Sequence, residues 1–338
     1  MKCFVTGATG HIGNVLVNEL FRKGHQVTSL VLPKDDISMI EPYTDIVYGN
    51  ILDKDKLIDI VKDFDIVFHL AGIVEIGSGK KKRIYDVNVN GTKNIIEACK
   101  TNNIKRMVYT SSVHAFKELP KGQVMKEPEE FNPDWVKGHY AKSKAIATNI
   151  VLKDSGKELE TIVVCPAGVI GPNDYQLSNT GQIFIDHLLG RLTAYIKGSY
   201  NFVDVRDLVQ GIIFAAERGK DKEIYLMSGS DITVKELLDL ISEFSGKKKI
   251  RTKLAYWFIL ATSYFAELYY KIRRQKPLFT HYSVKVLRSN HAFDNSKAKR
   301  ELGFITRDIK DSVKDTLEFQ ANRYLVKKGK KWKKKLFD

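Results

Sequence analysis

Cysteines are scarce in this sequence. Only three occur among 338 residues, Cys3, Cys99 and Cys165, and each lies in an apolar segment. Disulfide scaffolds and cysteine-based metal sites need more cysteines at characteristic spacings. We therefore expect three buried free thiols in a cytoplasmic protein, and we expect no metal site.

Long hydrophobic runs are also missing. The aromatic-rich stretch Leu254–Ile272 stays uncharged for only thirteen residues before Glu267, whereas a helix that spans a bilayer needs about 20. Met1 and Lys2 lead directly into an apolar run, so we expect no signal or transit peptide. The segment 254–272 therefore either covers the core or the substrate, or it lies against a membrane interface through its aromatic face.

Acidic residues are fewer than basic ones. The chain carries 55 lysines and arginines against 40 aspartates and glutamates, a net charge of +15. Residues 327–338 hold seven lysines and one aspartate, which is +6 of that total. Such a tail either stays solvated or attracts anionic membrane lipid or a phosphorylated ligand. We expect no specific nucleic-acid partner.

The sequence does contain a regular alternation of short apolar runs and helical spacings. The predicted strands are 2–6, 26–32, 45–48, 66–70, 106–110 and 161–165, and the predicted helices are 14–22, 54–62, 83–100 and 139–153. This order is typical of βαβ units, and it predicts an α/β fold with a doubly wound parallel sheet covered on both faces. The alternation ends near Pro172, beyond which 183–189, 202–216, 223–227 and 233–244 predict a smaller α+β region.

Gly7, Gly10 and Gly13 stand where the first strand meets the first helix. Glycine permits a tight turn and the close approach of a ligand, and a helix N-terminus offers unpaired N–H groups to a pyrophosphate. The spacing G-x-x-G-x-x-G differs from the G-x-G-x-x-G fingerprint, but it still predicts a dinucleotide site. The intervening residues assigned to this site are Thr9, His11 and Ile12.

Tyr140 and Lys144 form a second motif. If both lie on one helix, their i,i+4 spacing places the two side chains on the same face. A tyrosine titrates at about 10, and a neighbouring ammonium favours the phenolate, so the pair predicts a proton donor and acceptor for a carbinol oxygen. The same spacing recurs at Tyr324 and Lys328, but in a basic tail with no site around it.

These motifs carry a family resemblance. From residue 1 to about 320 the chain resembles the extended short-chain dehydrogenase/reductases of the NAD-dependent epimerase/dehydratase family. The further segments that match are 65–72 (DIVFHLAG), 88–92 (NVNGT), 109–112 (YTSS) and 203–207 (VDVRD). Within the family the chain is most similar to the dihydroflavonol reductase and 3β-hydroxysteroid dehydrogenase branch, through 165–172 (CPAGVIGP), 289–293 (SNHAF) and 297–303 (KAKRELG).

The resemblance implies an NAD(P)-binding Rossmann domain over 1–174, to which 201–218 return, a substrate-binding region over 175–322 and a basic tail over 323–338. It also implies that Tyr140 is the general acid/base, that Lys144 lowers its pKa and holds the nicotinamide ribose, and that Ser112 binds the substrate oxygen. Ser111 and Thr110 are the alternatives to Ser112. The other residues implied at the cofactor are Asn88 and Thr110 in its hydrogen-bond network, Leu70, Ala71 and Gly72 near the adenosine ribose, Asn50 and Ile51 at the adenine, and Pro166 and Val169 at the nicotinamide.

The choice between NAD(H) and NADP(H) depends on the end of the second strand, where an acid binds the ribose 2′-hydroxyl in NAD-dependent enzymes. This strand ends at Leu32, Lys34 follows, and the first acids are Asp35 and Asp36. The missing acid and Lys34 favour NADP(H), although no arginine stands there to hold a 2′-phosphate.

We expect an oxidoreductase that interconverts a secondary alcohol and a ketone on a hydrophobic, steroid- or flavonoid-like substrate. A nucleotide-sugar epimerase with the same Tyr–Lys pair is the alternative. A dehydratase is disfavoured because Val113 and His114, and not acids, follow Ser112. A cofactor-binding sensor without chemistry is disfavoured by the intact pair. A homodimer paired through helices is left open, as is peripheral contact with an anionic membrane.

Overall fold

The computed structural model describes residues 1–74, 81–261 and 286–327. Seven parallel strands form one large sheet in the order β10-β6-β5-β4-β1-β2-β3. Their bounds are β1 Lys2–Thr6, β2 Gln26–Val31, β3 Asp45–Tyr48, β4 Ile66–His69, β5 Arg106–Thr110, β6 Glu160–Pro166 and β10 Ile224–Met227. The predicted α/β fold with a parallel sheet is confirmed.

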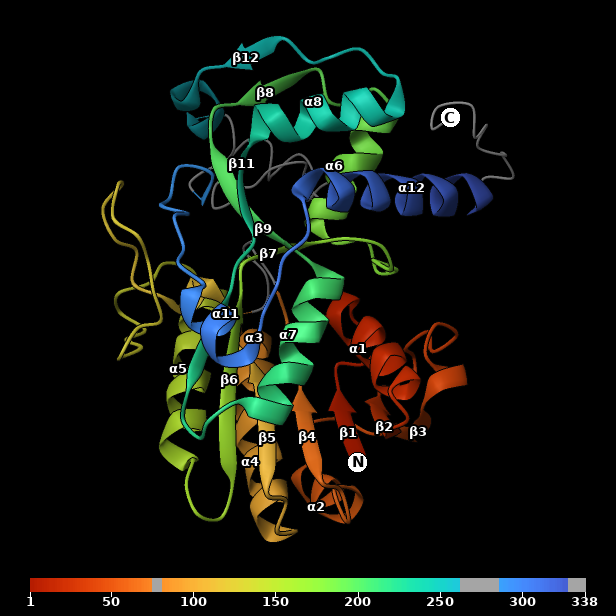
Figure 1. Cartoon of the computed structure of the whole chain (residues 1–338), viewed down its shortest axis with the longest axis vertical. Coiled ribbons are helices and arrows are strands. Elements are labelled where there is room, and N and C mark those ends of the chain that lie inside the picture. Colours follow the sequence, from red (N-terminus) through yellow and green to blue (C-terminus); the bar gives the residue numbers. More distant parts are fainter. Residues whose placement is uncertain (75–80, 262–285, 328–338) are drawn as a thin grey trace.

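Helices cover both faces of this sheet (Figure 1). One face carries α1 (His11–Arg22), α7 (Val205–Arg218) and α11 (Ser296–Leu302), and the other carries α2 (Lys54–Ile60), α4 (Gly91–Thr101) and α5 (His139–Asp154). Successive strand residues point to opposite faces, so Val5 and Phe68 enter the first core while Phe4 and Val67 enter the second. Two hydrophobic layers therefore hold the sheet rigidly between the helices.

The strand order reverses between β1 and β4. The chain moves outward from β1 through β2 and β3, and then returns to β4 on the other side of β1. Thr6 at the end of β1 pairs with His69 at the end of β4. Open parallel sheets bind ligands at such a switch point, outside the carboxyl ends of the strands. The glycine turn after β1 and the segment after β4 meet there.

The helix predicted over 83–100 is interrupted. It consists of α3 (Lys81–Tyr85), a π-helical turn over Asp86–Asn90, and α4. Single π-helical turns inside helices are frequently found at functional sites. Asn88 lies in this turn with 1% of its surface exposed, so the interruption falls on a residue assigned to the cofactor site.

The C-terminal region lies beyond the carboxyl ends of the large sheet (Figure 1). β7 (Gly168–Ile170), β9 (Ser199–Asp204) and β11 (Ser230–Thr233) form one small sheet, and β8 (Ala194–Ile196) and β12 (Thr252–Leu254) form another. A third core lies among these strands and α6 (Asn179–Leu188), α8 (Val234–Ser245) and α12 (Ile309–Lys327). A capping box of Thr233 and Glu236 opens α8.

Two elements of the predicted substrate-binding region join the cofactor side. β10 extends the large sheet beside β6, and α11 contributes Ala298 and Leu302 to the core that α7 also lines. The residues that return to the large sheet therefore include β10 and α11 as well as 201–218. The division at residue 174 stays a prediction.

Parts of two predicted features lie outside the described residues, namely 262–272 of the aromatic segment and 328–338 of the lysine tail. Across the described ranges, every helix is too short or too polar to cross a membrane. The three cysteines are buried free thiols, as predicted, and burial raises the pKa of each to about 12.

A network of ion pairs links the C-terminal region to the large sheet. Asp204 caps α7 and accepts hydrogen bonds from the Arg206 backbone N–H at 2.9 Å and from its guanidinium at 2.8 and 2.9 Å. Arg206 also pairs with Asp315 of α12 at 2.6 Å, and Arg307 lies 3.7 Å from Asp204. Burial raises the pKa of Asp204, but the bonds from Arg206 outweigh it and the net pKa is lowered.

We expect Asp204→Asn to lower the free energy of unfolding by about 3 kcal/mol at pH 7, the lower end for breaking a buried ion pair, because Arg206 is 30% exposed. Since the folded-state pKa is lowered, the wild-type advantage is present above the unfolded value of 3.8 and is lost as the pH falls through the folded-state pKa. Urea unfolding at neutral and acid pH measures this difference. Asp315→Asn is the control, with an expected loss below about 1 kcal/mol. A difference that persists unchanged in acid would contradict the role of the charge.

Candidate active site

The three glycines of the turn after β1 have different tasks. Gly7 has φ +73°, and a Cβ there would lie 2.7 Å from the backbone N of Ala71. A Cβ on Gly13 would lie 2.1 Å from the carbonyl oxygen of Gly7. At Gly10 the nearest atom to a Cβ would be the Gly7 oxygen at 3.2 Å. Gly7 and Gly13 are therefore required by the fold, whereas Gly10 leaves room in front of the N-terminus of α1.

The N-terminus of α1 is suited to an anion. No side chain caps it and no acid lies in its first turn, so its N–H groups are available to a pyrophosphate. His11 bonds the carbonyl oxygen of Pro172 at 2.9 Å. Burial lowers the pKa of His11, so its ring is neutral at neutral pH and adds no cation. Ile12 packs on the hydrophobic core behind the turn.

Asp35, one of the two acids that follow Lys34 beyond the strand end, borders the same turn. Asp35 accepts a hydrogen bond from the Thr9 hydroxyl at 3.3 Å and another from the Leu32 N–H at 3.2 Å. The loop after β2 thus folds back and brings an acid to the glycine turn from four residues beyond the strand. Lys34 beside it is exposed. The sequence pattern looks for the acid at the strand end, so it misses an acid that a returning loop brings to the glycine turn.

The residues assigned to the adenosine side lie around the switch point. Leu70 donates its N–H to Thr6 O at 3.1 Å, and Ala71 donates to the Thr6 hydroxyl at 3.2 Å. Ile51 is buried against Gly91. Asn50 is exposed, and its side chain accepts from the Leu52 N–H at 3.0 Å. The Asn50 side chain therefore holds its own turn, as expected for a turn-forming asparagine.

Tyr140 and Lys144 lie on α5, as the spacing predicts, and both are almost fully buried. The helix begins after Gly138, whose φ of 92° favours glycine. The Lys144 ammonium donates to the carbonyl oxygen of Thr110 at 2.7 Å and lies 3.4 Å from the Tyr109 hydroxyl. The carboxyl end of β5 therefore lies directly against the Lys144 ammonium.

Three hydroxyl residues, Thr110, Ser111 and Ser112, stand at the end of β5 and directly after it. Their hydroxyl groups have different partners. The Ser111 hydroxyl bonds Thr148 at 2.6 Å. The Ser112 hydroxyl interacts with the Tyr140 hydroxyl and accepts the His114 N–H at 3.2 Å. Among the described residues, Thr110 Oγ1 is buried without a hydrogen-bond partner. Of the three, Ser112 is the one that acts on the tyrosine, and Thr110 is the one whose hydroxyl oxygen has no partner among the described residues.

The pKa of Tyr140 departs from the expectation. Burial raises it, and the hydrogen bond with Ser112 lowers it by less, so the net pKa is raised. Burial lowers the pKa of Lys144 to about 8. The sequence predicted that Lys144 lowers the pKa of Tyr140, but the ammonium points to Thr110 instead. At neutral pH the site therefore holds a protonated tyrosine beside a charged lysine.

Asn88 connects the segment after β4 to α5. It accepts the Ile73 N–H at 2.7 Å, and its amide donates to the Ser143 hydroxyl at 2.9 Å. A Cβ on Gly72 would lie 3.3 Å from the Asn88 oxygen and 3.4 Å from the Lys144 nitrogen. The 72–73 backbone is thus held close to Lys144, and the supporting role of Asn88 at a cofactor stays a prediction.

The nicotinamide side has fewer polar contacts. Pro166 is the last residue of β6 and pairs with Met227, and Val169 in β7 packs on the core. The glycine turn, the open N-terminus of α1, the close approach at Gly72 and the unpartnered Thr110 oxygen together fit a dinucleotide cofactor. Bound there, it would extend from α1 to Lys144.

Three aromatic residues beyond Ser112 were not assigned from the sequence. The His114 ring lies 6.0 Å from the Tyr140 ring, centroid to centroid, and its Nε2 is 2.8 Å from the Tyr200 hydroxyl. The Tyr200 ring contacts His291 at 4.7 Å. Burial, with a smaller effect of His291, lowers the pKa of His114 to about 4. These residues come from distant segments, so only the fold brings them to the substrate side of Tyr140.

Comparisons with known proteins show the family. Residues 3–228 match the model of the NAD dependent epimerase/dehydratase family, and the chain belongs to that family. It is 27% identical to sterol demethylase protein B of Methylococcus capsulatus, over 96% of this chain and all of that one. It is 29% identical to a putative dihydroflavonol 4-reductase of Synechocystis, over 96% of both chains. The resemblance to 3β-hydroxysteroid dehydrogenases is confirmed by one from Mycolicibacterium neoaurum, 26% identical over 90% of this chain and 86% of that one.

Solved structures share the fold. The crystal structure of gox2253 superposes with a TM-score of 0.83 at 30% identity, covering 95% of this chain and 98% of that one. A UDP-glucose 4-epimerase from Thermotoga maritima gives a TM-score of 0.79 at 21% identity, over 96% of this chain and all of that one. The second likeness shows the fold alone.

We expect Gly10→Val to remove measurable binding of NADH and NADPH while the chain stays folded, because the added side chain occupies the space in front of α1. Calorimetry measures binding, and thermal unfolding checks the fold. Gly13→Ala is the contrasting variant, whose Cβ meets backbone at 2.1 Å and should lower the melting temperature. Undiminished nucleotide affinity in folded Gly10→Val would remove the turn from the site.

Proposed function

We propose that this member of the NAD-dependent epimerase/dehydratase family is an oxidoreductase that interconverts a secondary alcohol and a ketone on a hydrophobic substrate. The observation that carries the proposal is the buried Tyr140, close enough to Ser112 for that hydroxyl to lower its pKa, on one helix with the buried Lys144 ammonium at the carboxyl end of β5. The names of the relatives, which refer to sterols, dihydroflavonols and hydroxysteroids, support a hydrophobic ring system.

The chain's own residues manage the proton. In the reductive direction Tyr140 donates its proton to the substrate oxygen, and Ser112 donates a hydrogen bond to the same atom. The raised pKa keeps Tyr140 protonated before the transfer, and Lys144 holds the nicotinamide ribose. Oxidation runs these steps in reverse. The nicotinamide supplies the hydride chemistry when it is bound.

Cofactor binding divides among three groups of residues. The N-terminus of α1 takes the pyrophosphate, Lys144 and Thr110 take the nicotinamide ribose, and the loop after β2 takes the adenosine ribose. Lys34 favours the 2′-phosphate of NADP(H), whereas the Asp35 carboxylate accepts a bond from a 2′-hydroxyl and repels a phosphate. We propose that these two side chains set the preference, which the sequence alone assigns to NADP(H).

A nucleotide-sugar epimerase is the second candidate. It uses the same tyrosine, and the exposed lysines Lys197 and Lys253 of the C-terminal region favour a phosphorylated substrate. A non-catalytic sensor is the third, and the assembled Tyr140, Ser112 and Lys144 argue against it. We further propose a cytoplasmic homodimer, since a reducing compartment keeps the three thiols free and the family resemblance implies pairing through helices.

Turnover tests the mechanism. NADH and NADPH oxidation is measured with sterol, flavonoid and aliphatic ketones and with nucleotide sugars. On the substrate found, Tyr140→Phe should lower kcat at least about 10²-fold, as for loss of a general acid, while cofactor affinity stays unchanged. Tyr43→Phe, which precedes β3 at the amino edge of the sheet and packs on Phe21 near the end of α1, is the matched control. Wild-type turnover in Tyr140→Phe would overturn the proposed mechanism.

The cofactor preference is tested by two opposite changes. Asp35→Asn should raise the ratio of kcat/KM for NADPH over NADH by at least about tenfold, an effect of roughly 1.4 kcal/mol, because it removes a charge that repels the 2′-phosphate. Lys34→Gln should lower the same ratio. If neither variant moves the ratio, the loop after β2 does not contact the ribose.

A further inference from the structure

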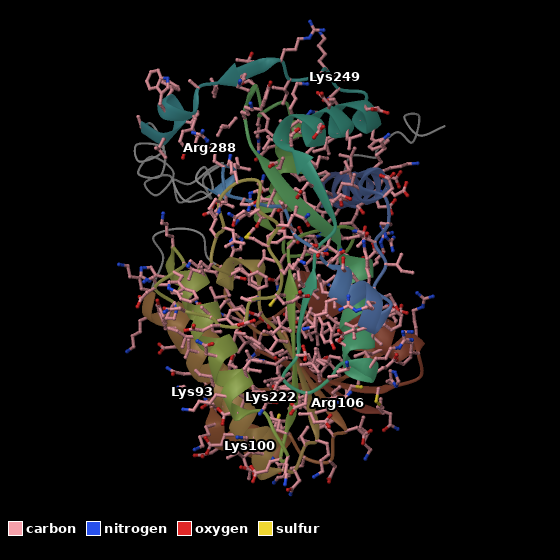
Figure 2. All side chains as sticks on the ribbon, turned by 60° about the vertical axis from the view of Figure 1, so that its left-hand side comes forward. Lys93, Lys100, Arg106, Lys222, Lys249 and Arg288 are labelled. Atoms are coloured by element: carbon pink, nitrogen blue, oxygen red, sulfur yellow. The ribbon has the colours of Figure 1, made fainter. Side chains whose placement is uncertain are left out.

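A cavity of about 720 Å³ lies in the C-terminal region between β8, β9 and β12. The described residues that line it include five cations and no carboxylate. We call it the basic pocket, and its cations are Lys121, Lys197, Lys235, Lys253 and Arg288. Figure 2 shows Arg288 in the C-terminal half, at the opposite end of the molecule from Lys93.

Among residues 1–74, 81–261 and 286–327, most of this charge has no partner in an ion pair. Lys235 pairs with Asp239. The Arg288 guanidinium lies 4.4 Å from the centroid of the Tyr256 ring, a cation–π contact that leaves its charge in place. Within the described part of the chain, Lys121, Lys197 and Lys253 form no ion pair. Several like charges facing one cavity repel one another, and a phosphoryl group with two negative charges relieves that repulsion.

Large aromatic side chains follow the pocket residues in the chain. Leu254 and Tyr256 line it, and the helical turn that follows carries Trp257 and Phe258, which are 72% and 45% exposed. Their rings pack edge to face at 5.9 Å. Exposed tryptophan next to lysines is the arrangement found where an apolar phase meets charged headgroups.

The basic pocket adjoins the active site through β9. Gly198 and Ser199 line the pocket, and the next residue, Tyr200, bonds His114 against the Tyr140 ring. β9 therefore carries pocket residues and a side chain of the Tyr140 surroundings at successive positions, and Trp257 and Phe258 follow the pocket residue Tyr256 in the chain.

We propose that the substrate is a phosphorylated amphiphile. Its hydroxyl-bearing end lies at Tyr140, its phosphate or diphosphate lies in the basic pocket, and its hydrocarbon part lies on Trp257 and Phe258. This inference deepens the proposed function and rests on it for the hydroxyl end. It accounts for a hydrophobic substrate and a cationic pocket in the same enzyme.

Binding to the NADH-loaded protein tests the proposal, since the cofactor then fills the anion site at α1. The probes are dodecyl phosphate below its micelle concentration, dodecanol and inorganic phosphate. Dodecyl phosphate should bind at least about tenfold more tightly than either part alone. The double variant Lys197→Gln/Lys253→Gln should remove the gain from the phosphate, and Trp257→Ser the gain from the chain. Both sites are exposed, so the fold should persist.

The matched control is Lys93→Gln/Lys105→Gln, which removes the same charge from exposed positions on the cofactor side and should leave affinity unchanged. Equal binding of dodecyl phosphate to the wild type and the pocket variant overturns the proposal. Binding of UDP that depends on Lys197 and Lys253 but not on Trp257 also overturns the proposal, because it indicates a water-soluble nucleotide as the substrate. Binding to phosphatidylglycerol vesicles without binding of monomeric dodecyl phosphate overturns it in favour of a membrane headgroup.

The two proposals fail separately. Probe binding is measured without turnover, so its result does not depend on the Tyr140 mechanism. Tyr140-dependent reduction of an uncharged ketone, together with no phosphate-dependent binding, would retain the oxidoreductase and reject the phosphorylated substrate.

Discussion

A buried ammonium group is the feature on which the site depends. Lys144 is only 4% exposed, and a charge in such surroundings must be compensated by hydrogen bonds. The Thr110 carbonyl oxygen accepts one of its three N–H bonds at 2.7 Å. β5, α5 and the 72–73 segment must therefore converge on one atom. The Tyr109 hydroxyl accepts a second of these N–H bonds at 3.4 Å. One N–H group is left for a ribose, so cofactor binding would complete a compensation that the protein leaves partial.

The C-terminal region combines features that are usually separate. Its relatives by name act in sterol, flavonoid and steroid chemistry, and its fold is shared with a UDP-glucose 4-epimerase. In this chain the region holds the basic pocket and the exposed Trp257. A large sheet that supports the cofactor, joined to a region built from short strands, lets substrate preference change without disturbing the proton-handling residues.

Much of the cofactor domain could be predicted from the sequence because its signals are local. Strand β5 begins and ends where the apolar run does, and the Tyr140–Lys144 spacing defines a helix face without knowledge of the fold. What could not be predicted depends on tertiary placement. Asp35 reaches Thr9 only because the loop after β2 turns back. His114 and Tyr200 meet across 86 residues, and burial raises the pKa of Tyr140, which spacing alone cannot show.

The π-helical turn at Asp86–Asn90 has a consequence for how this chain can change in length. A π turn accommodates one residue more than an α-helix needs, and each helical residue advances the side-chain direction by about 100°. Deleting one residue there would let α3 and α4 merge into a regular helix and turn Asn88 away from Ile73 and Ser143. The helix would gain regular hydrogen bonds while the segment over Lys144 lost its anchor. A shorter, regular helix at this place would therefore be the more stable helix, but it would no longer hold the 72–73 backbone close to Lys144.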